Sequence, residues 1–150
     1  MTTTWVIAGT AMLAGLAIGA ASPASADPEK PTGPQMSGHY IETSTASTGQ
    51  STSNDWYVTP CGDGCASVGR ATGGQPYGEA RLVNGQWTMD STDDQVCREG
   101  NVVPNAYTSH YSWDPTALVG TIQVTYKVSA CGRHQPGDTG QFTMQLRQAP

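Results

Sequence analysis

The chain has 150 residues, with 7 Lys or Arg against 12 Asp or Glu and a formal net charge of −5. This length suits one domain rather than two, and the acidic balance argues against a basic nucleic-acid surface or a Lys/Arg-rich helix that lies on a membrane. Only 37% of the residues are hydrophobic, so we expect a thin core that the four cysteines help to hold.

Residues 1–26 are a predicted signal peptide. An apolar stretch runs from Trp5 to Ala20, and small residues precede Asp27 at the positions that signal peptidase reads. The first four residues carry no Lys or Arg, which leaves the true translation start open. An anchor that stays attached is the alternative, but the apolar stretch is short. We therefore expect a secreted or cell-envelope protein with no membrane span after cleavage.

Residues 27–37 contain three prolines and no periodicity, which predicts a flexible arm. Residues 38–150 then form a single predicted β domain, because apolar and polar residues alternate through most of this range. The clearest unit is a hairpin in which Asn84-Gly85 suits the two positive-φ positions of a type I′ turn. This turn pairs Val83 with Gln86, Leu82 with Trp87, Arg81 with Thr88 and Ala80 with Met89.

Further strands are expected over 38–45, 55–59, 65–70, 107–113, 121–128 and 142–146. About eight or nine short strands of this kind form either a small antiparallel barrel or a β-sandwich. The barrel is favoured because several inward faces mix small or polar residues with Trp and Tyr. A barrel can taper around such residues or leave a hollow.

Four cysteines in an exported chain more often form two disulfides than a zinc site. Of the three possible pairings, we favour Cys61 with Cys65 and Cys97 with Cys131, because two glycines let the five-residue loop close. A redox role for the first pair is the alternative, although three residues separate the thiols and the common oxidoreductase motif has two.

No convincing catalytic or metal-binding motif is present, so the sequence predicts neither an enzyme nor a cofactor. The histidines His39, His110 and His134 share no local spacing and are expected at the surface. The acidic cluster over 90–94 lacks the pattern of a calcium loop, which indicates a solvated turn. No Gly-x-Ser-x-Gly nucleophile elbow occurs.

The aromatic residues have two interpretations. Trp56, Trp87 and Trp113 fall on predicted inward faces, as does Tyr111. They are either the core of a protein with few aliphatic residues or the lining of a cavity for a small apolar ligand.

Several segments together resemble a pattern in small exported mycobacterial proteins of unknown function. They are residues 55–68, the Asn84-Gly85-Gln86-Trp87 hairpin, the Cys97 region, residues 111–115 and residues 130–132. The pattern is also similar to extracellular domains of some receptor Ser/Thr kinases, and residues 22–28 resemble mycobacterial export signals. The resemblance implies export and this architecture, and it assigns no catalytic residue.

We therefore expect an exported, non-enzymatic β domain, of undetermined oligomeric state, that binds a small apolar ligand or an envelope or protein partner. The alternative is an uncharacterised envelope hydrolase or metal-dependent enzyme. Convergence of the histidines with a carboxylate in one cleft would favour that alternative.

Overall fold

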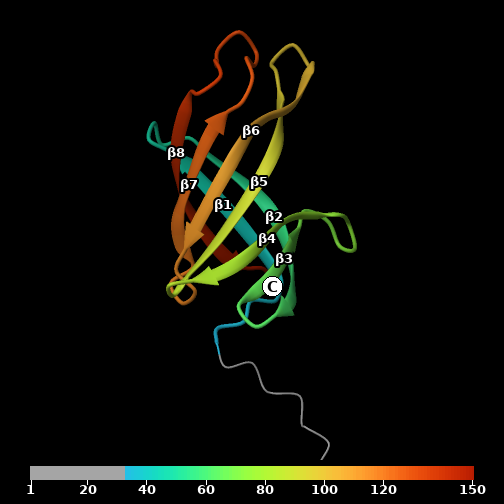
Figure 1. Cartoon of the computed structure of the whole chain (residues 1–150), viewed down its shortest axis with the longest axis vertical. Coiled ribbons are helices and arrows are strands. Elements are labelled where there is room, and N and C mark those ends of the chain that lie inside the picture. The colour runs from blue at the N-terminus through green and yellow to red at the C-terminus, as the bar shows by residue number, and fades with distance from the viewer. Residues whose placement is uncertain (1–32) are drawn as a thin grey trace, which may run out of the picture.

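A computed structural model describes residues 33–150, which form an eight-stranded antiparallel barrel (Figure 1). The strands are β1 (Gly38–Ala46), β2 (Ser51–Gly62), β3 (Cys65–Gly69), β4 (Pro76–Val83), β5 (Gln86–Val96), β6 (Val102–Trp113), β7 (Val119–Tyr126) and β8 (Thr139–Gln148). Each strand pairs with the next, and β8 pairs with β1 to close the barrel. The predicted all-β barrel is therefore confirmed, and the alternative sandwich is wrong. Over residues 33–150 the structure has no helix that is long and apolar enough to cross a membrane.

The predicted signal peptide over 1–26 lies outside the described residues, as does most of the predicted arm over 27–37. The last part of that arm, residues 33–37, has no regular secondary structure. Its Met36 is nevertheless only 3% exposed and packs with the core. Packing of the domain therefore begins before the first strand.

The hairpin between β4 and β5 has the predicted register, with Val83 opposite Gln86 and Leu82 opposite Trp87. Asn84 and Gly85 have φ values of 50° and 81°, as a type I′ turn requires. Turn chemistry and the alternation of apolar residues thus selected the same pairing.

Several strands are longer than the sequence predicted. Strand β2 begins at Ser51, and β5 continues to Val96 through the acidic cluster over 90–94. The predicted solvated turn at that cluster is wrong, because the cluster lies in a paired strand that buries Ser91 and Asp93.

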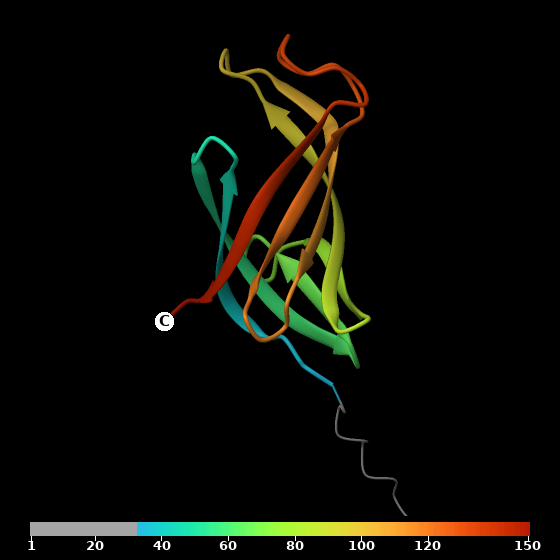
Figure 2. The ribbon, with the colours of Figure 1, turned by 90° about the vertical axis from the view of Figure 1, so that its left-hand side faces the viewer.

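The two ends of the barrel differ. At the end that holds the turns over 62–64 and 84–85, termed the floor, Trp56, Trp87 and Trp113 are at most 1% exposed. The ring of Trp113 lies 5.7 Å from that of Trp56 and 6.4 Å from that of Trp87. At the opposite end, termed the mouth, the loops over 97–101 and 127–138 project together (Figure 2). The floor is therefore a packed aromatic core.

Both predicted disulfides are present, and the described residues contain no free cysteine. Cys61–Cys65 lies in the β2–β3 hairpin at the floor. Cys97–Cys131 joins the two long loops at the mouth, between β5 and β6 and between β7 and β8. Each end of the barrel thus has its own crosslink.

Among the described glycines, Gly120 of β7 has the least room for a side chain. A Cβ at this position would lie 1.9 Å from the carbonyl oxygen of Ser112 and 2.7 Å from Cα of Trp113. We expect Gly120→Ala to lower the free energy of unfolding by about 3 kcal/mol or more in urea denaturation, because backbone atoms cannot give way as a side chain can. Gly140→Ala is the matched control, since its nearest contact is a Phe142 ring atom at 3.5 Å. Equal, small losses in both variants would contradict this packing.

Candidate functional site

A cavity of about 370 Å³ occupies the mouth half of the barrel interior. Most of the residues that line it carry a hydroxyl, amide or charged group. They are Glu42, Ser44, Thr52, Asn54, Arg70, Tyr77, Asp93, Gln95, Tyr107, Ser109, Tyr111, Ile122, Val124, Tyr126 and Phe142. The volume lies near the lower end of the range of about 300–1,000 Å³ for small-molecule sites.

The strands that build the floor also build the cavity. Along β5, every second residue faces inward, and these residues read Trp87, Met89, Ser91, Asp93 and Gln95 from floor to mouth. Side chains that point to the same face of a strand recur every two residues, so the polar positions continue the apolar ones. The cavity is therefore the polar continuation of the core.

A hydrogen-bond network around Asp93 forms one wall. The Tyr77 hydroxyl donates to Asp93 Oδ2 over 2.7 Å, and Arg70 Nη2 donates to Asp93 Oδ1 over 3.1 Å. Ser91 Oγ lies 2.9 Å from both Asp93 Oδ2 and the Tyr77 hydroxyl. Because the single proton of Tyr77 goes to Asp93, the Tyr111 hydroxyl, 2.7 Å away, donates to Tyr77. The network fixes five side chains from three strands, β4, β5 and β6, and from the loop that follows β3.

The phenols of this wall are hydrogen-bond donors at physiological pH. Burial raises the pKa of both Tyr77 and Tyr111 above the ordinary value of 10.0. Burial, with the neighbouring Asp93 carboxylate, raises the pKa of Tyr107 to about 12. A phenol with such a pKa is a poor general base. A molecule that entered the cavity would therefore meet protonated phenols on this wall.

Glu42 of β1 forms part of the opposite wall and is only 2% exposed. Its Oε2 accepts a hydrogen bond of 2.9 Å from Asn54 Nδ2, whereas its Oε1 has no partner. Burial raises the pKa of the Glu42 carboxyl above its ordinary value of 4.5, although the Asn54 hydrogen bond and the charge of Arg70 act in the opposite direction. Glu42 is thus a buried acid that lines the cavity with one carboxyl oxygen hydrogen-bonded and the other without a partner.

The four aromatic residues predicted to line a cavity lie in two places. Tyr111 lines the cavity, whereas Trp56, Trp87 and Trp113 pack against one another at the floor. The indoles do not line the hollow because the inward positions closer to the mouth are polar. The sequence did not identify Glu42, Arg70, Tyr77 and Asp93 as site residues. Glu42 and Asp93 share the period-two spacing of the buried residues on their strands, whereas Tyr77 is out of phase with Ala80 and Arg70 follows the end of β3.

The three histidines do not converge. His39 bonds Asp55 and His110 bonds Asp90, each over 2.7 Å on exposed positions of different strands. His134 stacks on Tyr126 at 3.9 Å between ring centroids. None of the three lines the 370 Å³ cavity. The convergence that would favour an enzyme is therefore not found among the described histidines.

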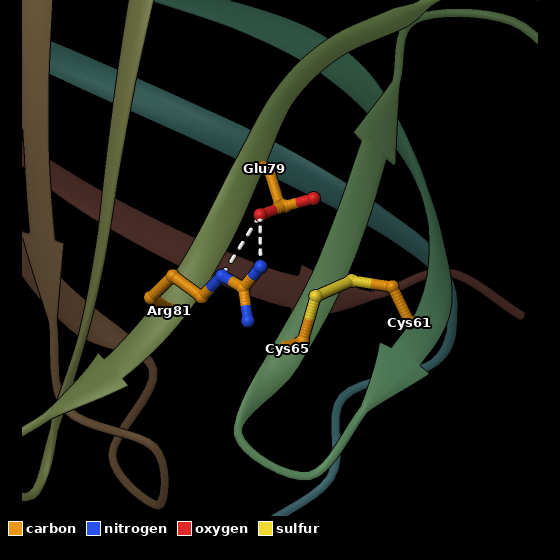
Figure 3. Close-up of a disulfide and its surroundings, with 4 residues drawn as sticks. All are labelled: Cys61, Cys65, Glu79 and Arg81. Carbon is orange, nitrogen blue, oxygen red and sulfur yellow. Dashed lines mark hydrogen bonds and ion pairs between the residues drawn. A yellow bond between two sulfur atoms is a disulfide. The ribbon is translucent and has the colours of Figure 1, made fainter.

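A cluster at the floor brings Cys61, Cys65 and Glu79 within 4.8 Å of one another (Figure 3). The two sulfur atoms are joined in the disulfide, so neither is a thiolate that could bind a metal. Glu79 instead accepts a hydrogen bond from Arg81 Nε over 2.8 Å. This cluster is structural.

No family model, curated protein or solved structure matches the chain.

We expect Asp93→Ala to lower the free energy of unfolding by about 2–4 kcal/mol, because it leaves the Tyr77 and Ser91 hydroxyls and the Arg70 guanidinium without their acceptor. Asp90→Ala, on the same strand, is the matched control. Its carboxylate is exposed and pairs with an exposed His110, so we expect a change within about 0.5 kcal/mol. Urea denaturation measures both variants, and similar losses would contradict the role of the network.

Glu42→Gln tests whether burial of this acid opposes folding. The folded-state pKa is raised, so between the ordinary pKa of 4.5 and the raised value the folded state binds more protons than the unfolded state. Stability from this group is therefore present below pH 4.5 and is lost as pH rises. We expect the stability of Glu42→Gln relative to wild type to increase as pH rises above 4.5, as measured by thermal unfolding at several pH values. A difference that stays constant or falls would contradict the assignment.

Proposed function

We propose that the protein is an exported, non-enzymatic barrel that binds one small polar molecule inside its mouth. The observation that carries this proposal is the 370 Å³ cavity, whose wall holds polar side chains in fixed positions above a packed aromatic floor. Closed barrels of about eight strands have an interior that side chains can fill or that can hold one small ligand. Here the floor half is filled and the mouth half is hollow.

The lining favours a polar ligand over the apolar ligand expected from the sequence. Transfer of a polar group into a site without hydrogen-bond partners is unfavourable. An apolar ligand in a polar site is likewise unfavourable, because it displaces water from protein donors and acceptors and offers them no hydrogen bond. Tyr107 and Ser109 contribute hydroxyls to the cavity lining, and Glu42 contributes Oε1, which has no hydrogen-bond partner. A ligand with its own donors and acceptors satisfies these groups.

The disulfides support the proposed compartment. Both cysteine pairs are oxidised, and disulfides persist in oxidising spaces such as the extracellular medium. The Cys97–Cys131 bond also ties together two loops at the mouth, which would keep the entrance to the site in one shape. The resemblance to exported mycobacterial proteins stays a prediction.

A fragment titration tests the proposal. In ¹⁵N-HSQC spectra of the disulfide-bonded protein, we expect small polar fragments to shift amide signals of cavity-lining residues. Val124→Phe places a ring in the hollow and should abolish these shifts. Gln123→Phe adds the same ring on the outer face of β7 and should leave them unchanged. Fragments that shift only signals of the outer face, or that bind both variants equally, would overturn the proposal.

A further inference from the structure

We infer that the ligand is a small organic cation, a protonated or quaternary amine, and that Glu42 is its counter-ion. This inference rests on the proposed function and adds to it the sign of the ligand's charge. It depends on three features of the cavity: an unsatisfied buried acid, the balance of charges in the lining and the aromatic rings of the lining.

Glu42 is not fully satisfied by the protein in either protonation state. As a carboxylate, it has one oxygen, Oε1, without a donor among the described residues. As a neutral acid, it would need an acceptor for its proton, but Oε2 already receives the Asn54 amide and Oε1 has no partner. A buried polar group without a partner is unfavourable, and a buried charge without compensation is more so. A cation in the cavity would supply the missing compensation.

The charge balance of the lining points to the same ligand. The lining holds two acids, Glu42 and Asp93, and one base, Arg70. Arg70 is already paired with Asp93 over 3.1 Å. With both acids ionised, Glu42 therefore gives the cavity its excess of one negative charge, and charges interact more strongly there than in bulk water.

The aromatic rings give a cation a second kind of partner. Tyr107, Tyr111, Tyr126 and Phe142 all line the cavity, and the centroids of Tyr107 and Tyr126 lie 5.4 Å apart. A cation over the face of such a ring is attracted by the ring quadrupole. The wall already contains one such pair, since the Arg70 guanidinium carbon lies 3.8 Å from the Tyr77 centroid. Aromatic rings beside an acid are a fitting environment for an ammonium group.

The test compares benzylamine, a cation at neutral pH, with benzyl alcohol, which has nearly the same shape and no charge. Chemical-shift titration of the wild-type protein at pH 7 measures both dissociation constants. We expect the amine to bind at least tenfold more tightly than the alcohol. We also expect Glu42→Gln to weaken amine binding at least tenfold and to change alcohol binding by a much smaller factor, because the variant removes the charge that only the amine pairs with.

Asp55→Asn is the matched control, because it removes one acid from the outer face of β2 and should change neither dissociation constant. Equal binding of amine and alcohol to the wild-type protein would overturn the inference even if Glu42→Gln failed to fold. In that outcome, cavity shifts that Val124→Phe abolishes would leave the proposed function standing. Absence of cavity shifts with every probe would overturn both.

Discussion

The pairing of β1 with β8 closes the sheet into a barrel. It runs from Tyr40 opposite Gln148 to Ala46 opposite Phe142 and joins the first strand of the domain to the last. Without it, both strands would be open sheet edges, and the inward faces of eight strands would have no common interior. Closure also brings Glu42 of β1 into the same interior as Asp93 of β5, although β1 and β5 are not paired in the sheet.

Within that closed wall, polarity changes along the barrel axis. Near the floor, the inward positions hold three indoles, Met89 and Val68, which are large enough to exclude water. Towards the mouth, the inward positions become Ser, Asp, Asn, Gln and Tyr, which pack less tightly and bond one another. The apolar core is thus small and lies at one end of the barrel. A disulfide at each end restricts the turns and loops there. Because the chain has few apolar residues, its core is small and part of the barrel interior is lined by polar side chains around a cavity.

The sequence predicted the features that local chemistry decides. Asn84-Gly85 set one register, and Gly62 and Gly64 allowed a five-residue disulfide loop. Alternation predicted an all-β domain, and the mixture of polar and aromatic residues on the inward faces favoured a barrel. It did not reveal the site, because hydrophobic alternation stops where the inward residues become polar. Asp93 therefore looked like part of a solvated turn, and nothing near Glu42 in the sequence shows that a closed barrel will bury it. These residues line the interior only because strands that are far apart in the sequence pair and close the barrel.

Water that enters the barrel should reach the cavity and not the floor directly below it. Water–protein NOE measurements on methyl groups distinguish these two regions. We expect contacts between water and the methyl groups of Ile122 and Val124, which line the cavity, and none at Val68 or Met89 in the floor. If the Ile122 and Val124 methyl groups showed no contact with water, the barrel would be filled along its whole length, and the proposed site would not exist.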